Sequence, residues 1–278
     1  MSRFFFIFTH MKYKDFAIGI FDSGVGGTSI WSEINLLLPN ESTLYLSDSK
    51  NAPYGEKSKE EILQLAIKNT EYLLDQQCKI IVVACNTATT NAIRYLRAHY
   101  KVPFIGIEPA IKPASFQTKT NTIGILATQG TLNSELFEHT SSKIDKEIRI
   151  VEQIGKGLVE LIEGGKLYSQ EMTTLLQSYL HPMLAQNIDC LVLGCTHYPY
   201  LIPQIRSIIG PRIQIIDSGQ AVAKQTKKIL ADTGLVNTGG NKIESSHEFL
   251  INSNKDTLVE LLKENKLKKQ HTIRETDF

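Results

Sequence analysis

The segment KIIVVACNTATT (residues 79–90) contains the pattern on which the fold prediction depends. A run of β-branched and apolar residues ends at a cysteine, and short polar residues that can cap a helix follow it. Such a run is typical of a strand buried in a parallel sheet, so Cys85 is predicted to lie where a strand ends and a helix begins. The segment CLVLGCTHYP (190–199) repeats the pattern around Cys195. The two thiols are therefore predicted to be presented alike, each at the carboxyl end of a strand.

The rest of the chain alternates between strand-length and helix-length patterns. Further short apolar runs occur at 17–21, 43–47, 102–107, 122–126, 149–153, 212–217 and 247–252. Amphipathic segments of helix length occur at 58–77, at 168–186, from residue 220 onward and at 255–265. Strand followed by helix, repeated, predicts an α/β fold with mostly parallel sheets, in which ligands bind at the carboxyl ends of the strands.

Length and internal repetition predict two domains. The 278 residues suit one large domain or two of about 130 residues each. The tripeptide DSG occurs twice, and the two cysteines are separated by the length of one small α/β domain. We expect two similar α/β domains related by a pseudo-twofold axis, with the active site in the cleft between them. The predicted division places residues 15–108 and 219–278 in the first domain and residues 109–218 in the second, with a hinge at 108–115 and an N-terminal extension at 1–14.

The bulk composition excludes several classes of protein. Hydrophobic residues make up 42% and charged residues 21% of the chain, which is ordinary for a soluble globular protein. The net charge of +1 predicts no nucleic-acid partner, and no stretch reaches the ~20 apolar residues of a membrane-spanning helix. Four cysteines are too few for a disulfide framework, and none are spaced as zinc ligands. We therefore expect a cytoplasmic protein without a metal.

The chemistry expected of Cys85 and Cys195 follows from their position. A free thiol has a pKa of about 8.5, and the positive end of a helix dipole lowers that pKa. Each thiol is thus expected to act as a prepared base. One thiolate that removes a proton and an opposing thiol that supplies one would invert a carbon stereocentre without a cofactor. Cys78 and Cys190, which no capping sequence follows, are expected to pack as small hydrophobic residues instead.

Asp22 and His197 are further candidates for proton transfer. Asp22 lies in GIFDSGVGGTS (19–29), a glycine-rich turn with neither the dinucleotide nor the phosphate-loop spacing. It could hold a thiol or an amino group by a hydrogen bond, or it could cap a helix. His197 is expected in the first turn of a helix as a neutral imidazole, since a helix N-terminus lowers its pKa. It could stabilise a thiolate at Cys195 or transfer a proton, or it could be a surface histidine.

Four strings occur in order along the chain: FDSGVGG (21–27), DSKNAPYG (48–55), ACNTAT (84–89) and GCTHYP (194–199). Together they resemble the glutamate racemases of the aspartate/glutamate racemase superfamily, and the likeness covers nearly all of the chain from about Ala17. The resemblance implies an isomerase without a cofactor that interconverts L- and D-glutamate. It further implies that the D-glutamate supplies peptidoglycan synthesis in the cytoplasm of a walled bacterium.

The resemblance also implies a role for each candidate residue. Cys85 would remove the α-proton of D-glutamate with the help of Asp22, and Cys195 would remove that of L-glutamate with the help of His197 and a glutamate. The family's glutamate is placed at Glu163, with Glu152 as a rival, because the Cys-Pro pair that often precedes it is absent from EQIGKGLVELIEGG. The implied substrate contacts are Asp22, Ser23, Tyr54, Gly55, Asn86, Thr87, Thr128, Thr131, Thr196 and His197.

Other functions remain open at this stage. A racemase of the same superfamily that acts on aspartate or a hydantoin would contain the same two thiols. A protein that binds a small acid between two domains without turning it over would share the architecture, and a thiol hydrolase is a weaker alternative because no separate His–Asp pair is evident. Members of the resembled family are often homodimers, and some are regulated by cell-wall precursors; the sequence decides neither property.

Overall fold

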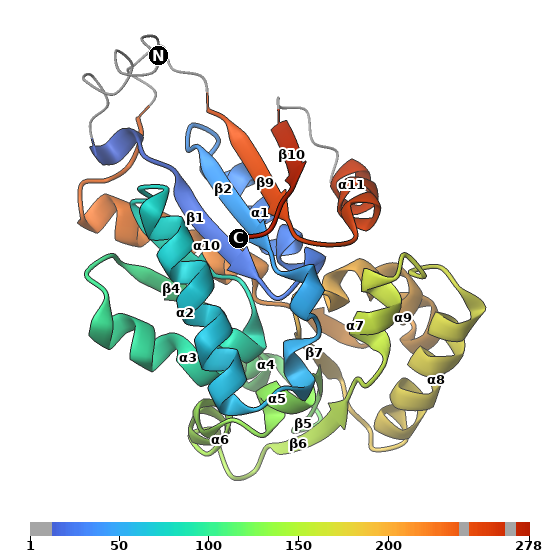
Figure 1. Ribbon diagram of the computed structural model, residues 1–278. Helices are drawn as coiled ribbons and strands as arrows, with labels where there is room; N and C mark the ends of the chain where they lie inside the picture. Colours follow the sequence, from blue (N-terminus) through green and yellow to red (C-terminus); the bar gives the residue numbers. More distant parts are fainter. Residues whose placement is uncertain (1–12, 239–244, 265–270) are drawn as a thin grey trace, which may run out of the picture.

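The computed structural model describes residues 13–238, 245–264 and 271–278, so residues 1–12 of the expected N-terminal extension lie outside the described residues. The strands form two sheets, and the strand pairs within both are parallel. Helices surround both sheets (Figure 1). The predicted α/β fold of two domains is confirmed.

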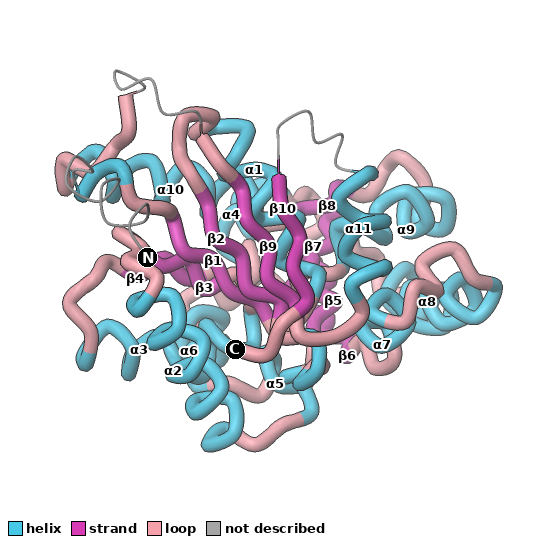
Figure 2. Tube along the Cα trace, turned by 45° about the horizontal axis from the view of Figure 1, so that its top comes forward, coloured by secondary structure: helices cyan, strands magenta, loops and turns pink. Residues whose placement is uncertain are grey.

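The larger sheet has six strands in the order β10-β9-β2-β1-β3-β4 (Figure 2). Its strands are β1 (Ile18–Asp22), β2 (Thr43–Ser47), β3 (Ile80–Val83), β4 (Phe104–Gly106), β9 (His247–Ile251) and β10 (His271–Glu275). The residues of β1, β2 and β3 are all buried, as expected for parallel strands with both faces covered by helices.

Helices cover the two faces of this sheet and complete what we call the six-stranded domain. One core packs the sheet against α1 (Thr28–Leu37), α10 (Gly219–Asp232) and α11 (Lys255–Glu264). A second core packs it against α2 (Lys59–Asp75) and α3 (Asn86–His99). Three short 3-10 turns, η3 (Val25–Gly27), η4 (Ser49–Asn51) and η5 (Tyr54–Glu56), follow the carboxyl ends of β1 and β2. They lie where a parallel sheet binds its ligands.

The smaller sheet has four strands in the order β6-β5-β7-β8 and belongs to what we call the four-stranded domain. Its strands are β5 (Thr122–Ala127), β6 (Arg149–Ile154), β7 (Cys190–Gly194) and β8 (Gln214–Ile216). Its helices are α4 (Ile111–Gln117), α5 (Gln129–Leu132), α6 (Glu135–Ser141), α7 (Leu158–Glu163), α8 (Gln170–Leu184) and α9 (Ile202–Ile209), and the 3-10 turn η6 (Tyr198–Leu201) precedes α9.

The two sheets repeat one topology. The order β2-β1-β3-β4 in the larger sheet recurs as β6-β5-β7-β8 in the smaller one, with β9 and β10 added beyond β2. Cys85 comes soon after β3, and Cys195 directly follows β7, which is the corresponding strand. The internal repeat that the sequence suggested is therefore present in the strand order, and it gives both cysteines the same place in their sheets.

Three details differ from the sequence prediction. The expected hinge at 108–115 contains the start of α4, which packs against β5 and β7. Strand β10 was not predicted, because HTIRE is polar and the strand pairs only with β9 at the edge of the sheet, where most of its residues are exposed. The residues after Cys195 form a turn and the 3-10 segment η6 rather than the first turn of an α-helix.

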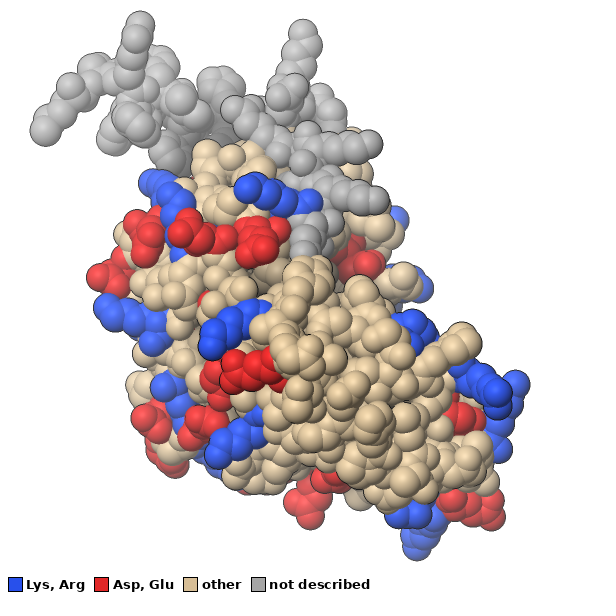
Figure 3. All heavy atoms as spheres, turned by 90° about the vertical axis from the view of Figure 1, so that its right-hand side faces the viewer, with Lys and Arg blue, Asp and Glu red and all other residues tan. Residues whose placement is uncertain are grey.

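The surface adds two observations. No helix among the described residues is long and apolar enough to cross a bilayer. On the face shown in Figure 3, acidic and basic side chains are interspersed, with no extended patch of one sign.

Candidate active site

Cys85 caps the first turn of α3. Its Sγ accepts a hydrogen bond from the backbone N–H of Ala88 at 3.4 Å and lies 3.6 Å from Ser23 Oγ, to which it can donate. The side chain is buried, with 4% of the residue exposed. The predicted strand-to-helix junction is confirmed here, and the thiol faces the end of β1.

The expectation that a helix N-terminus lowers the pKa of Cys85 is wrong. Burial, followed by the charge of Asp22, raises the pKa of this thiol well above its usual range, and the hydrogen bonds from Ala88 and with Ser23 offset only part of that rise. A charge on Cys195 also contributes to the rise. Cys85 is consequently a thiol, and hence a proton donor, at neutral pH.

Asp22 is the last residue of β1, and its carboxyl group makes hydrogen bonds to both domains. Its Oδ2 accepts hydrogen bonds from the backbone N–H of Gly27 at 2.6 Å and from Thr196 Oγ1 at 3.2 Å. Its Oδ1 lies 3.4 Å from Ser23 Oγ, so Asp22 reaches Cys85 through that hydroxyl. Complete burial is the main reason that the pKa of Asp22 rises to about 6. Of the two sequence interpretations, Asp22 is not the cap of α1, which begins at Thr28 after Gly27, and it reaches the Cys85 thiol through Ser23.

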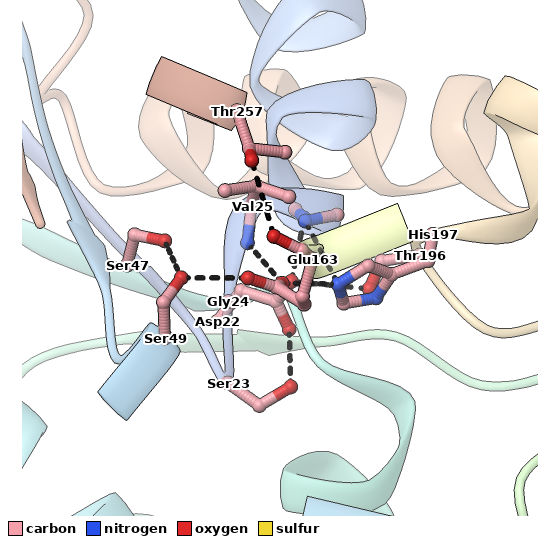
Figure 4. Close-up of polar contacts among 12 residues, drawn as sticks. Asp22, Ser23, Gly24, Val25, Ser47, Ser49, Glu163, Thr196, His197 and Thr257 are labelled. Atoms are coloured by element: carbon pink, nitrogen blue, oxygen red, sulfur yellow. Dashed lines mark hydrogen bonds and ion pairs between the residues drawn. The ribbon is translucent and has the colours of Figure 1, made fainter. Parts of the chain in front are cut away.

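Cys195 is linked to a histidine and a carboxylate, and Figure 4 shows the pair formed by His197 and Glu163. Its Sγ lies 3.7 Å from His197 Nδ1, and His197 Nε2 lies 2.6 Å from Glu163 Oε1. Glu163 is the last residue of α7 and is buried, whereas Glu152 lies on β6 and is exposed. The structure thus brings Glu163, and not its rival Glu152, to the imidazole of His197.

The expectation of a neutral His197 is also wrong. Burial alone would lower the pKa of this imidazole, but hydrogen bonds with Cys195 and Glu163 and the charges of both raise it well above its usual range. The α-helix dipole that motivated the expectation is absent, because only the 3-10 turn η6 begins here. The raised pKa favours the imidazolium form of His197, which can hold a thiolate at Cys195.

The Glu163 carboxylate also receives hydrogen bonds from the six-stranded domain. The backbone N–H of Val25 donates to Oε1 at 2.7 Å, and Ser49 Oγ donates to Oε2 at 2.9 Å. Thr257, in α11, donates its hydroxyl to the carbonyl oxygen of Glu163 at 3.1 Å. Figure 4 shows these donors around the carboxylate and backbone of Glu163. Sequence reasoning missed Ser49 and Thr257, although Ser49 lies within the DSKNAPYG string.

Three predicted substrate residues form a cluster of hydroxyl groups across the domain interface. Thr87 Oγ1, in α3, lies 2.9 Å from Thr128 Oγ1 and 3.3 Å from Thr131 Oγ1, and the latter two are 3.0 Å apart. Gly55 packs so closely on Thr128 that a Cβ added to the glycine would lie 2.8 Å from the threonine Cβ. Thr128 and Gly55 also line a pocket between η5 and the β6–α7 loop.

Tyr54 and Asn86 differ in how their polar groups are used. The hydroxyl of Tyr54 donates to Asp48 Oδ2 at 2.5 Å and accepts from Asn69 Nδ2 at 3.1 Å, so it is engaged inside the six-stranded domain. By contrast, among the described residues the buried amide of Asn86 has no partner for its nitrogen or its oxygen. Because an unpaired buried amide is costly, Asn86 is the predicted contact whose side chain is most available to a ligand.

The arrangement can transfer protons from two sides. One thiol is a proton donor beside a carboxylate, and the other sulfur lies beside an imidazolium that would stabilise its thiolate. Among the residues that the structure describes, no three His, Cys, Asp or Glu side chains are grouped in a way that could hold a metal ion.

Comparison with known proteins identifies the family of the chain. Residues 28–226 match the family described as Asp/Glu/Hydantoin racemase. The glutamate racemase of Herpetosiphon aurantiacus is 46% identical over 224 residues, which are 81% of this chain and 88% of the relative. That of Ralstonia pickettii is 48% identical over 222 residues, which are 80% of this chain and 79% of the relative.

Solved structures of glutamate racemases share the fold. The isoform RacE1 from Bacillus anthracis superposes with a TM-score of 0.81 at 31% identity, covering 95% of this chain and 98% of that one. The Francisella tularensis enzyme, solved in complex with D-glutamate, gives a TM-score of 0.79 at 28% identity and covers 95% of this chain and 98% of its own. The Escherichia coli enzyme, in complex with L-glutamate and the activator UDP-MurNAc-ala, gives 0.77 at 29% identity, covering 90% of this chain and 95% of its own. With the family matched over most of its length and relatives this similar, the chain belongs to the Asp/Glu/hydantoin racemase family.

Proposed function

We propose that this protein is a glutamate racemase that needs no cofactor and uses Cys85 and Cys195 as its two acid–base groups. The observation that supports this most is the corresponding placement of the two cysteines, each after the third strand of a repeated sheet. Each has its own ionisable partner: Asp22 through Ser23 for Cys85, and His197 for Cys195. The relatives named glutamate racemase support glutamate as the substrate.

In the direction from L- to D-glutamate, the Cys195 thiolate removes the α-proton and becomes a thiol. The electron pair left on the α-carbon then takes a proton from the Cys85 thiol on the opposite face, which leaves Cys85 as the thiolate. The imidazolium of His197 holds the Cys195 thiolate before the reaction, and the high pKa of Cys85 keeps it protonated and ready to donate. The resting protonation state is thus the one that accepts L-glutamate.

In the direction from D- to L-glutamate, the same groups exchange roles. Cys85 must first lose its proton, and Asp22, which is ionised above about pH 6, is the nearby carboxylate that can accept this proton through Ser23. Cys85 then removes the α-proton of D-glutamate, and the Cys195 thiol supplies a proton to the other face. Burial of both sulfurs keeps water from quenching the carbanion between the two steps.

Substrate binding would rely on neutral donors. The free amide of Asn86 and the backbone N–H groups at the start of α3 can hold a carboxylate, as helix N-termini commonly do. The hydroxyls of Thr87, Thr128 and Thr131 can bind a second carboxylate after exchanging their mutual hydrogen bonds for it. We assign Ser23, Gly55, Thr196 and the backbone of Tyr54 to the remaining contacts.

The wider role follows from this proposal. We infer that the D-glutamate supplies peptidoglycan synthesis in the cytoplasm, and that residues 15–108 with 219–278 and residues 109–218 move as the two domains. The activator named with the Escherichia coli structure makes a cell-wall precursor the first effector to test here. Dimer formation is a separate matter for measurement in solution.

The experiment that tests the proposal follows the circular dichroism of pure L- or pure D-glutamate with the purified protein. Both signals are expected to decay to zero, since the enantiomers have equal free energies. Cys85→Ser and Cys195→Ser are each expected to slow racemisation by a factor of about 10² to 10⁴, the usual contribution of a positioned acid or base. Racemisation by either variant at the wild-type rate would reject the two-base assignment.

The same assay separates the alternatives. Faster racemisation of aspartate or of a hydantoin than of glutamate would place the protein elsewhere in the family. Binding of glutamate without any exchange of its α-hydrogen with deuterated water would identify a binding protein instead.

A further inference from the structure

The site has two halves: the Cys85 half contains Cys85, Ser23 and Asp22, and the Cys195 half contains Cys195, His197 and Glu163. The two halves differ in where their hydrogen bonds come from. The contacts of Cys85 come from Ser23 and Ala88, which belong to the six-stranded domain together with Cys85 itself. The contacts of the Cys195 half cross the interface, because the Glu163 carboxylate of the four-stranded domain accepts hydrogen bonds from the other domain. Separation of the domains would leave the hydrogen bonds of the Cys85 thiol intact. It would remove the Thr196 donor from Asp22, and it would remove both the Val25 and the Ser49 donors from Glu163.

Ser49 is the side chain that supplies one of those donors. It begins η4, just after β2, and it is buried. Its Oγ lies 2.9 Å from Glu163 Oε2 and 3.0 Å from Ser47 Oγ. A carboxylate can only accept, so the Ser49 proton points to Glu163 and the Ser47 hydroxyl donates to Ser49 in turn. Figure 4 shows the two serines in a row on one side of Glu163.

The contact fixes the orientation of the carboxylate. Oε1 is shared between the Val25 N–H and the His197 imidazole, and Oε2 is held by Ser49. With both oxygens held, the carboxylate cannot rotate about its last bond, and Oε1 stays 2.6 Å from His197 Nε2. Without Ser49, Oε2 would be a buried oxygen with no donor among the described residues, and rotation would weaken the support of His197.

We propose that Ser49 is a positioning residue for the Cys195 half of the site, which it completes by orienting Glu163 only when the two domains are closed. This inference rests on the proposed racemase function. Its consequence is that proton transfer at Cys195 is efficient only in the closed cleft, whereas the hydrogen bonds of the Cys85 thiol itself are all made within the six-stranded domain. Domain closure is therefore required for efficient acid–base catalysis on the Cys195 side of the substrate.

The test compares the wild type with Ser49→Ala. Removal of one hydrogen bond to a charged group is expected to lower kcat/KM about tenfold. Because L- and D-glutamate are equally stable, kcat/KM must fall by the same factor in both directions, so rates alone cannot show which half is affected. Primary isotope effects on kcat/KM with α-deuterated substrates can show it.

The isotope effects are expected to move in opposite directions. With α-deuterated L-glutamate, Cys195 removes the deuteron, so slowing Cys195 makes this step more rate-limiting and increases the isotope effect. With α-deuterated D-glutamate, Cys85 removes the deuteron and Cys195 acts afterwards, so the isotope effect decreases. A role limited to folding would leave both isotope effects unchanged.

Matched variants complete the experiment. Ser49→Thr retains the hydroxyl and is expected to recover most of the activity and the wild-type isotope effects. Ser29→Ala removes another serine hydroxyl that crosses the interface, to the carbonyl of Thr196 at 2.9 Å, without touching Glu163. It is expected to leave both isotope effects as in the wild type. Glu163→Gln combined with Ser49→Ala is expected to be no worse than Glu163→Gln alone, because the two residues act together.

The outcomes are distinct. Opposite shifts in the two isotope effects, with recovery in Ser49→Thr, support the proposal. Isotope effects that stay constant or shift together in Ser49→Ala, in a variant whose thermal unfolding matches the wild type, overturn it. A wild-type protein that does not racemise glutamate would instead overturn the proposed function, before any variant is considered.

Discussion

At the scale of single residues, the two cysteines have helpers of opposite charge. Asp22 is a buried carboxyl whose pKa rises to about 6, and His197 is a buried imidazole whose pKa is well above its usual range. A carboxylate disfavours the thiolate at Cys85, whereas an imidazolium favours it at Cys195. The pair therefore separates a proton donor from a proton acceptor across one site, as a racemase requires in each direction.

Asp22→Asn tests the role of the carboxylate. The variant can keep the hydrogen bond from Gly27 but cannot be charged. For the wild type, kcat/KM is expected to rise with pH through about 6 as Asp22 ionises, whereas the variant is expected to lack this limb and to lose about 10²-fold in kcat/KM. Profiles of kcat/KM between pH 5 and pH 9 measure both effects, and a variant that retained the same limb would show that another group produces it.

The same substitution has a predicted effect on stability. The folded-state pKa of Asp22 is raised from 3.8 to about 6, so ionising it costs the folded protein stability as the pH rises across that range. At about 1.4 kcal/mol per pKa unit, the cost above pH 6 is about 3 kcal/mol. Asp22→Asn avoids it and should unfold at a higher temperature than the wild type at pH 8, with a smaller difference at pH 4. An equal difference at both pH values would contradict the stated cause.

At the scale of elements, the glycine-rich turn η3 and the loop before it fit against the other domain's polar groups. A Cβ at Gly24 would overlap the Glu163 carboxylate, and a Cβ at Gly26 would overlap the imidazole of His197. The backbone N–H of Val25, between them, donates to Glu163. Glycine is thus required at positions 24 and 26 so that Glu163 and His197 can approach the backbone closely. The glycine-rich sequence predicted a close approach but did not identify these two residues as the partners.

Gly26→Ala is expected to displace His197 and to lower kcat/KM at least about tenfold, because misplacing a catalytic group by 1 Å costs up to ~10²-fold. Gly219→Ala is the control, since its added Cβ would meet only the movable side chains of Asp217 and Glu33 at 3.1 Å. Steady-state kinetics and thermal unfolding of both variants provide the comparison. A wild-type value of kcat/KM for Gly26→Ala would contradict the prediction, because it would show that η3 and His197 can move apart without loss of activity.

The strand–helix alternation and the four motif strings were sufficient to predict the two sheets and both thiol positions. They could not predict the ionisation of Cys85 and His197, because burial and partners distant in sequence outweigh the local helix dipole. They also missed Ser49 and Thr257, whose contacts with Glu163 span 114 and 94 residues. Such contacts exist only after the domains are packed together.

At the scale of the whole molecule, the structure is closed over the candidate site. Cys85 and Cys195 are only 4% and 7% exposed. Contacts between the domains include the hydrogen bond from Asn91 Nδ2 to the carbonyl of Gly130 at 3.2 Å, beside the threonine cluster. Glutamate cannot reach the thiols unless the domains separate. Its binding then favours the closed form, and the closed form excludes water from the site.

Thiol labelling tests this requirement for opening. Iodoacetamide is expected to modify Cys85 and Cys195 slowly, through the open form, and saturating glutamate should slow both further by favouring closure. Cys78 and Cys190 are buried and lie away from the site, so they should react only after unfolding. Peptide mass spectrometry over time gives the rate at each cysteine. Equal labelling of all four thiols, with no effect of glutamate, would exclude a gated site.

The most direct test of proton transfer from two sides is the turnover of L-glutamate in deuterated water. After a few per cent of conversion, the enantiomers are separated and the deuterium at the α-carbon of each is measured by mass spectrometry. Two opposed thiols, of which Cys85 donates a solvent-derived deuteron, predict D-glutamate with one α-deuterium while the remaining L-glutamate is still unlabelled. Deuterium entering both enantiomers at the same rate, or D-glutamate that retains the original hydrogen, would mean that a single group acts and would contradict the account.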